Sequence, residues 1–163
     1  AKGIGNGAPL GAVTTRAEIA QPLGTRLHFN TFGGNPVSMT QGLAVLEIVD
    51  EERIQQRAKE TGEYMKEKLL ELQAKHALIG EVRGMGLMIG VELVKNRATK
   101  EPATAATADI VEQAKNRGLL LGKGGLYGNV IRIKPPMCLT KADCDFLVDC
   151  LDECMTLTRI GNG

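Results

Sequence analysis

Lys2 is the residue of this sequence whose surroundings point most clearly to chemistry. It lies in a run rich in small residues, with Gly3, Gly5 and Gly7 at alternate positions, so a large group could approach the backbone closely. A lysine amine in such a place can form a Schiff base with an aldehyde if its pKa is low enough for the neutral form to be accessible. Lys2 is therefore a candidate for covalent catalysis.

The same run allows two other interpretations. A glycine-rich turn holding one lysine is often only a surface turn, and that interpretation stays open. The alternate glycines also imitate part of a dinucleotide-binding fingerprint, which requires a helix directly after it. Here Pro9 and Gly11 follow, and the pattern of residues 12–15 predicts a strand instead of a helix. The nucleotide interpretation is therefore disfavoured.

A second candidate site surrounds Thr31. The segment continues through Gly33 and Gly34 to Asn35 and Pro36, which together are typical of a helix start, with asparagine as N-cap and proline in the first turn. A hydroxyl, unpaired backbone N–H groups and a helix N-terminus can converge there on an anion. The alternative is an ordinary capped helix with a glycine hinge.

Arg132 is the third candidate. It lies in residues 130–136, where apolar and basic residues alternate before two prolines, a pattern that predicts a strand with Ile131 and Ile133 on one face and Arg132 on the other. A planar guanidinium can hold a carboxylate through two parallel hydrogen bonds. An arginine on a strand can equally be a surface charge or part of a structural ion pair.

The three motifs together resemble those of the class III aminotransferases, which are fold type I enzymes dependent on pyridoxal phosphate. The resemblance extends to roughly residue 155 and is nearest to the alanine–glyoxylate aminotransferase branch. It implies that Lys2 holds pyridoxal phosphate as a Schiff base and shuttles protons. It also implies that Thr31 binds the cofactor phosphate of the neighbouring subunit and that Arg132 binds the substrate α-carboxylate.

The resemblance also implies a reaction and partners. We expect an amino group to pass from an amino acid, L-alanine in the nearest branch, to a 2-oxo acid, glyoxylate. We further expect a homodimer or homotetramer with Thr31 at the interface, and a mitochondrial location. Alternatives are another class III enzyme of the ornithine or 4-aminobutyrate type, a related decarboxylase or aminomutase, and a non-catalytic α/β module that binds a phosphate or a partner.

Family membership would make this chain the C-terminal part of a longer enzyme. We expect an α/β fold in which residues 1–50 end the large cofactor domain, 51–75 form an interdomain helix, 76–157 form the small domain, and 158–163 are a tail. The family's aspartate for the pyridine nitrogen, its upstream phosphate loop and its ring-stacking aromatic residue are not in this sequence. We therefore expect the isolated chain to be inactive.

The elements that must position these residues follow from periodicity and punctuation. The helix after Asn35 is apolar on nearly all sides, which predicts burial or an interface. The last helix, with a capping box of Thr140 and Asp143, should carry its apolar residues as far as Leu157 on one face. Other expected elements are an amphipathic helix over 51–74, strands over 87–93 and 119–121, a helix over 104–117, surface loops over 95–103 and 122–125, and a turn with close backbone packing around residues 83–86.

Composition excludes several classes of function. The net charge is +1, from 20 basic and 19 acidic residues, and aromatic content is 3%, which argues against a nucleic-acid surface. The sequence contains no run of 18 apolar residues, so it does not predict a membrane-spanning helix. Four cysteines lie between 138 and 154 without a metal-binding pattern, so we expect reduced thiols on a helix and no metal. We expect His76 to be exposed, His28 to lie near the dimer site or simply to pack, and Lys123 to be solvated.

Overall fold

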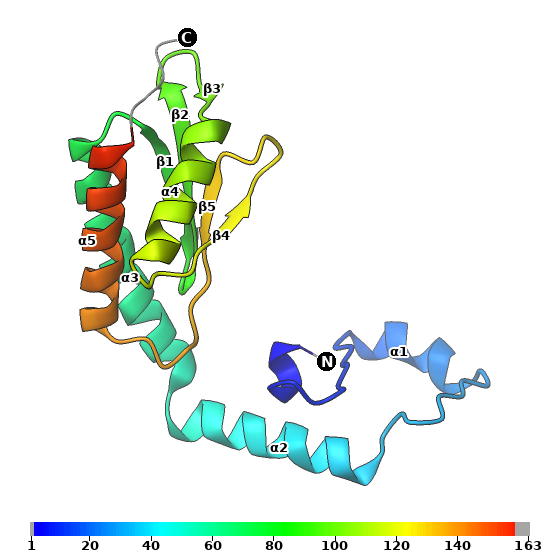
Figure 1. Cartoon of the computed structure of the whole chain (residues 1–163). Coiled ribbons are helices and arrows are strands. Elements are labelled where there is room, and N and C mark those ends of the chain that lie inside the picture. Colours follow the sequence, from blue (N-terminus) through cyan, green and yellow to red (C-terminus); the bar gives the residue numbers. More distant parts are fainter. Residues whose placement is uncertain (1, 159–163) are drawn as a thin grey trace. The chain divides into compact units, whose positions relative to one another are not determined.

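The structure is a computed structural model that describes residues 2–158 (Figure 1). The chain divides into two compact units, Ala1–Ile54 and Gln55–Gly163, which we call the first and second units. The three candidate residues divide between them, with Lys2 and Thr31 in the first unit and Arg132 in the second. Each unit is described by itself below.

The first unit contains a 3-10 helix η1 (Gly3–Gly5) and the helices α1 (Ala17–Gly24) and α2 (Pro36–Glu51). The packing of η1 against α2 is made through Leu10. A β-carbon on either Gly5 or Gly42 would lie 2.8 Å from Leu10 Cδ1, so both glycines are needed for Leu10 to fit there. This contact fixes the fold of the lysine segment on the helix.

The first unit differs from the sequence analysis in two respects. Residues 12–15 do not form the expected strand, and the helix α1, which contains Pro22, was not predicted. Pro22 is the sixth of the eight residues of α1 and, lacking an N–H, removes one hydrogen bond from this short helix. α1 has no buried residue, so its apolar residues give it no core of its own.

α2 begins where the sequence predicts, and its cap is complete. Asn35 Oδ1 accepts a hydrogen bond from Ser38 N at 3.0 Å, and Pro36 occupies the first helical turn. The apolar side chains of the helix are largely exposed in the first unit, at 70% for Val37, 57% for Leu43 and 59% for Leu46. Within the first unit, α2 is therefore stabilised by its N-terminal cap and not by burial of an apolar face.

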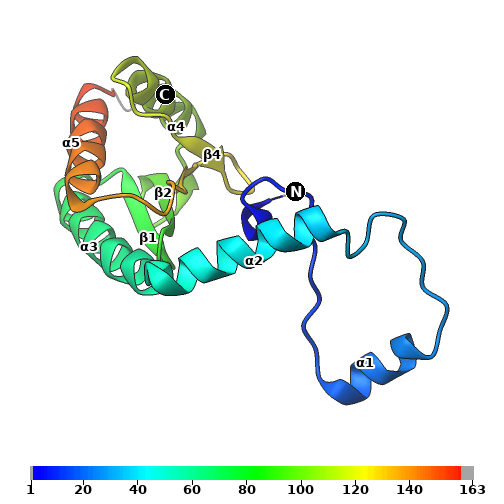
Figure 2. The ribbon, with the colours of Figure 1, turned by 90° about the horizontal axis from the view of Figure 1, so that it is seen from below.

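The second unit is a two-layer α/β arrangement with an antiparallel sheet in the order β1-β2-β5-β4, and β3 pairs with β2. Figure 2 shows its three helices on one side of the sheet. The elements are α3 (Ile54–Lys75), β1 (Ile79–Met85), β2 (Met88–Asn96), β3 (Glu101–Pro102), α4 (Thr104–Asn116), β4 (Gly122–Gly124), β5 (Val130–Ile133) and α5 (Lys141–Leu157).

Alternation along the two central strands decides which face is covered. Ile89 and Val91 of β2 pair with Ile133 and Ile131 of β5, and all four side chains are at most 2% exposed. They pack with buried residues of α3, α4 and α5 in one hydrophobic core. The alternate residues, including Arg132, lie on the opposite face, which we call the open face of the sheet. The predicted strand around Arg132 is confirmed.

The β1–β2 hairpin depends on close backbone packing, as the glycines of residues 83–86 predict. A β-carbon on Gly62 of α3 would lie 2.1 Å from the carbonyl oxygen of Gly86. Gly84 has φ +133°, and a β-carbon there would lie 2.1 Å from the carbonyl oxygen of Met88. Helix α3 can therefore approach the hairpin only because Gly62 lacks a side chain, and the two strands of the hairpin can pair as they do only because Gly84 lacks one.

Several details of the second unit differ from the sequence analysis. The strand predicted at 119–121 lies at Gly122–Gly124, inside the expected loop, because ladder pairing with β5 overrides the low strand propensity of glycine. The expected loop 95–103 contains the short strand β3. Leu157, expected on the apolar face of the last helix, is 59% exposed. The capping box of Thr140 and Asp143 is confirmed, and the helices predicted over 104–117 and 51–74 are confirmed within a few residues.

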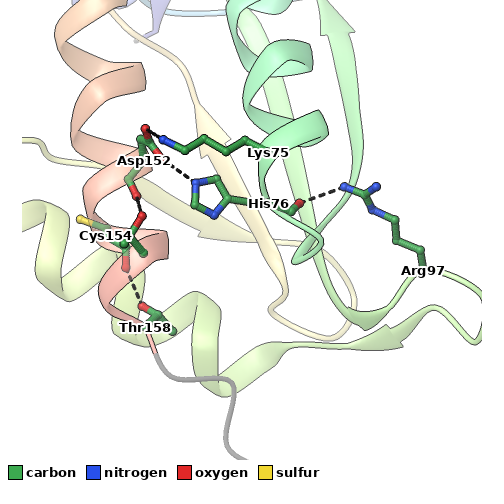
Figure 3. Close-up of polar contacts among 7 residues, drawn as sticks. Lys75, His76, Arg97, Asp152, Cys154 and Thr158 are labelled. Carbon is green, nitrogen blue, oxygen red and sulfur yellow. Dashed lines mark hydrogen bonds and ion pairs between the residues drawn. The ribbon is translucent and has the colours of Figure 1, made fainter.

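Polar contacts close the second unit between α3 and α5 (Figure 3). Asp152 of α5 pairs with Lys75 and with His76, whose Nε2 lies 2.6 Å from Asp152 Oδ1. The side chain of His76 is only 13% exposed, so the expectation of an exposed histidine is wrong. Arg97 donates to the carbonyl oxygens of Gln73 and His76, and thereby caps the C-terminal end of α3.

Thr158, the first residue of the expected tail over 158–163, packs against the rest of the second unit. Its side chain is buried, and Oγ1 donates to the carbonyl oxygen of Cys154 at 2.9 Å and contacts Asp109 Oδ2 at 3.1 Å. It therefore ends α5 and joins that helix to α4. Residues 159–163 of the expected tail lie outside the described residues.

The cysteines are free thiols. Cys144, Cys150 and Cys154 are buried in the core, and Cys138 is exposed. Burial raises the pKa of the Cys144 thiol, and burial together with neighbouring Cys154 raises that of Cys150 to about 11. These thiols are therefore protonated at neutral pH and act as small apolar side chains.

Candidate functional site

Lys2 lies directly before η1 on a tightly turned backbone. Its carbonyl oxygen accepts a hydrogen bond from Gly7 N at 3.1 Å, and Asn6 adopts a left-handed conformation with φ 47°. The side chain of Lys2 is exposed, and its amine has no partner among residues 2–158. The turn therefore presents a primary amine on a backbone whose neighbouring residues, Gly3 and Gly7, contribute no side chain.

The Thr31 segment is a turn held by asparagine side chains. Asn30 Oδ1 accepts from Phe32 N at 3.3 Å, and Asn35 Nδ2 donates to the carbonyl oxygen of Phe32 at 2.9 Å. Gly34 supplies the positive φ, +73°, that lets the chain enter α2. The Thr31 hydroxyl is exposed and makes no hydrogen bond within the described part of the chain. It is therefore available to an anion at the start of α2.

Arg132 lies on β5 between two glycines. Its cross-strand partners are Gly90 of β2 and Gly122 of β4, so no neighbouring side chain flanks it within its row of the sheet. The side chain is exposed and is not paired with any carboxylate of residues 2–158. Arg132 also lines a cavity of about 520 Å³ with apolar walls that include Leu121, Pro136 and Phe146.

Arg83 provides a contrast on the same open face. Its Nη1 lies 2.7 Å from Glu81 Oε2 and 2.5 Å from Glu92 Oε2. The hydrogen bond to Glu92 is the main cause that raises the pKa of Arg83 above its ordinary value. Of the two arginines, Arg83 is neutralised by two carboxylates of the sheet, whereas Arg132 has no carboxylate partner among residues 2–158.

The sequence analysis did not foresee the cavity beside Arg132 or the double pairing of Arg83. The cavity could not be read from spacing because it is formed by residues of β5, α5 and the segment before β4, which are distant in sequence. Pro135 and Pro136, which end β5, are its only signal in the local sequence. His28 and Lys123 are both exposed, and neither side chain has a hydrogen-bond or ion-pair partner among residues 2–158.

The sequence matches the family described as Aminotransferase class-III over residues 1–155. The chain belongs to the class III aminotransferases. The family expected from the three motifs is thereby confirmed, as is the α/β fold of the C-terminal portion of a fold type I enzyme. Pyridoxal phosphate is the cofactor expected from this membership. An amine transaminase from an uncultivated Pseudomonas species was solved in the PLP-bound form, and its structure resembles this chain with TM-score 0.74 and 32% identity. The similarity covers 83% of this chain and 31% of that transaminase.

Curated relatives include two named alanine–glyoxylate aminotransferases. The mitochondrial alanine–glyoxylate aminotransferase 2 homolog 2 of Arabidopsis thaliana is 58% identical over 96% of the chain and 33% of that relative. The mitochondrial human alanine–glyoxylate aminotransferase 2 is 44% identical over 96% of the chain and 31% of that protein. The chain thus spans about a third of the length of these relatives.

Other relatives carry a different name. Ethanolamine-phosphate phospho-lyase homolog 1 of Caenorhabditis elegans is 41% identical over 96% of this chain and 34% of that protein. A phospholyase from Arthrobacter, solved in complex with phosphoethanolamine, has TM-score 0.90 and 34% identity over 96% of this chain and 37% of its own. The family therefore includes proteins named for two chemistries.

The residues present fit pyridoxal phosphate by their chemistry. The cofactor has an aldehyde, for which the Lys2 amine is the complementary nucleophile, and a phosphate, for which the Thr31 hydroxyl and the N-terminus of α2 are suitable donors. Neither side chain is committed to another group among residues 2–158. Within the same described residues, no cluster of metal-ligating side chains is present, and no helix is both long and apolar enough to cross a bilayer.

Proposed function

We propose that the protein containing this chain is a transaminase that moves an amino group from L-alanine to glyoxylate. Lys2 holds pyridoxal phosphate as a Schiff base, Thr31 binds the cofactor phosphate, and Arg132 binds the substrate carboxylate. The observation that carries this proposal is the unpaired guanidinium of Arg132 on a packed strand, beside an Arg83 that the sheet itself neutralises. Names of relatives support the donor and acceptor.

The roles of the residues follow from their chemistry. When bound, the cofactor supplies the electron sink that stabilises negative charge at the substrate α-carbon. Arg132 orients the amino acid by two parallel hydrogen bonds to its carboxylate. Lys2 Nζ, when not bonded to the cofactor, would take the proton from the substrate α-carbon and would give it to the carbon that carried the aldehyde of the cofactor. The Thr31 hydroxyl would donate a hydrogen bond to a phosphate oxygen, and the N-terminus of α2 adds a favourable dipole.

We further propose that the protein is a homodimer or homotetramer in which Thr31 serves the cofactor of the neighbouring subunit, and that it is mitochondrial. The first part is supported by the exposure of the Thr31 turn and of α2 in the first unit, and the second by the names of relatives. The isolated chain should not transaminate, because it spans about a third of those relatives.

A second candidate function is a lyase that acts on an amine phosphate. It is favoured by the similarity to the Arthrobacter phospholyase, whose structure holds phosphoethanolamine. The guanidinium of Arg132 could bind a phosphate as readily as a carboxylate. Arg132 alone therefore does not separate the two substrates.

The two candidates are separated by assaying the full-length protein with each substrate. With L-alanine and glyoxylate, the proposal predicts equal amounts of pyruvate and glycine. With phosphoethanolamine, it predicts no inorganic phosphate above background. Phosphate release without pyruvate would overturn the proposal in favour of the lyase, and the Arg132→Gln variant should raise the KM for L-alanine by about tenfold or more.

A further inference from the structure

We propose that Gly122 is a positioning residue for Arg132: the missing side chain at 122 is what allows the guanidinium to lie where a substrate carboxylate meets it. The inference rests on the proposed role of Arg132. Gly122 and Arg132 are paired across β4 and β5, so a side chain at 122 would project from the same face as Arg132.

The space above Gly122 is occupied by the arginine side chain itself. A β-carbon at position 122 would lie 3.1 Å from Arg132 Nε and 3.3 Å from Arg132 Nη2. The remaining close atom is the carbonyl oxygen of Arg132, also at 3.3 Å. Even one methyl group would therefore require the guanidinium to shift by some tenths of an ångström.

Backbone conformation does not account for this glycine. Gly122 has no φ in the left-handed region, unlike Gly125, the residue directly after β4, which has φ +83°. An alanine could adopt the strand conformation at 122 without strain. Glycine weakens a strand interior, so a strand glycine without a conformational reason marks a close approach by another group. Here that group is the Arg132 side chain.

The chain offers a matched control two residues along the same strand. Gly124 projects from the same face as Gly122, has no left-handed φ, and a β-carbon there would meet no described atom within 4 Å. Gly122→Ala and Gly124→Ala are therefore the same chemical change on the same strand. Only the first reaches Arg132.

The test uses the full-length holoenzyme and propionate, the carboxylate of alanine without its amino group. We expect Gly122→Ala to raise the dissociation constant of propionate, measured by calorimetry, by about tenfold, because one bidentate ion pair is misaligned. The KM for L-alanine should rise similarly with little change in kcat, and Gly124→Ala should leave both constants at the wild-type values. Equal effects of the two variants, or none at Gly122→Ala, would overturn the inference.

Arg132→Gln separates this inference from the proposed function. If Arg132→Gln binds propionate as the wild type does, the role of Arg132 fails and the inference fails with it. If Arg132→Gln weakens binding and Gly122→Ala does not, only the inference is overturned. The double variant should bind no more weakly than Arg132→Gln alone, since Gly122 acts through the guanidinium, and a further loss would contradict that.

A second pair of variants covers the case in which Gly122→Ala does not fold. Combining it with Arg132→Ala removes the side chain that the new methyl group would meet. Folding of the double variant, judged by its thermal midpoint, would support the contact between positions 122 and 132. Failure of the double variant as well would overturn it.

Discussion

The two units of the chain present their candidate residues on very different supports. Among the described residues of the first unit, only Gly5 and Ser38 are buried, and Lys2 and Thr31 lie on turns shaped by local hydrogen bonds. In the second unit, Arg132 lies on a strand whose neighbours Ile131 and Ile133 belong to a hydrophobic core shared by α3, α4 and α5. The second unit thus has a core of its own, and the first has none.

This difference shows that local sequence signals can shape the backbone of a segment without burying its side chains. An asparagine cap, a proline in the first turn and a few glycines suffice to shape the Lys2 and Thr31 segments without burying them. The apolar side chains that α2 leaves exposed would be costly on a separate domain. We therefore expect α2 to gain its burial from the remainder of the full-length protein.

Truncating one leucine in each unit should sharpen this comparison most strongly. Leu151 is fully buried in α5, and Leu46 of α2 is 59% exposed. In this 163-residue chain, Leu151→Ala should lower the free energy of unfolding by about 2–5 kcal/mol, because it leaves a cavity. Leu46→Ala should change it by less than about 0.5 kcal/mol, and urea denaturation measures both. A cost at Leu46 as large as that at Leu151 would mean that the first unit has a core of its own.

Helix caps should behave alike in both units, since a cap needs no core. Asn35 caps α2 and Thr140 caps α5, each through a hydrogen bond to the backbone N–H three residues on. Replacing either by alanine should cost about 1 kcal/mol, seen as faster amide exchange at Ser38 or Asp143 respectively. Slower or unchanged exchange at Ser38 in Asn35→Ala would show that something other than the cap holds the start of α2.

The smallest effect should come from pH and should be confined to the second unit. The hydrogen bonds from Lys75 and then His76 lower the pKa of Asp152 below its ordinary value of 3.8. Because the pKa of Asp152 is lower in the folded protein, its contribution to stability is fully present above its ordinary pKa of 3.8 and is lost as the pH falls through the lowered folded-state pKa. Asp152→Asn should therefore flatten the fall in the thermal midpoint below about pH 4.

Asp149 provides the control for that experiment. It is exposed on the same helix and has no side-chain partner among residues 2–158. Asp149→Asn should leave the dependence of the thermal midpoint on pH as it is in the wild type. A flattening as large as that of Asp152→Asn would show that the α3–α5 contacts are not its source.

The sequence predicts the elements that carry strong local signals and fails where pairing across the sheet decides. The Asn35 cap, the capping box at Thr140, and the alternation around Arg132 are each local, and each is confirmed. The strand at 122–124 consists of glycine, lysine and glycine, and forms only because β5 pairs with it. His76 was misjudged for the same reason, because its partner Asp152 is 76 residues away.

The site divides along the same line. Motifs in the sequence predict Lys2, Thr31 and Arg132 as site residues, whereas only the structure shows that Arg132 has no carboxylate partner among residues 2–158. Arg83 and Arg132 carry the same charge in the sequence, and only the register of β1, β2 and β5 brings Glu92 to the first of them. The glycines beside Arg132 become meaningful in the same way, once β4 is placed next to β5.

The account depends on one covalent bond, and borohydride reduction of the freshly purified full-length protein tests it most directly. Reduction should fix the cofactor on the protein, and intact mass with peptide mapping should find one pyridoxyl group, on Lys2. The mapped peptide should contain Lys2 and continue into the glycine-rich segment that follows it in this sequence. An unmodified Lys2, or a pyridoxyl group on a different lysine, would contradict the account.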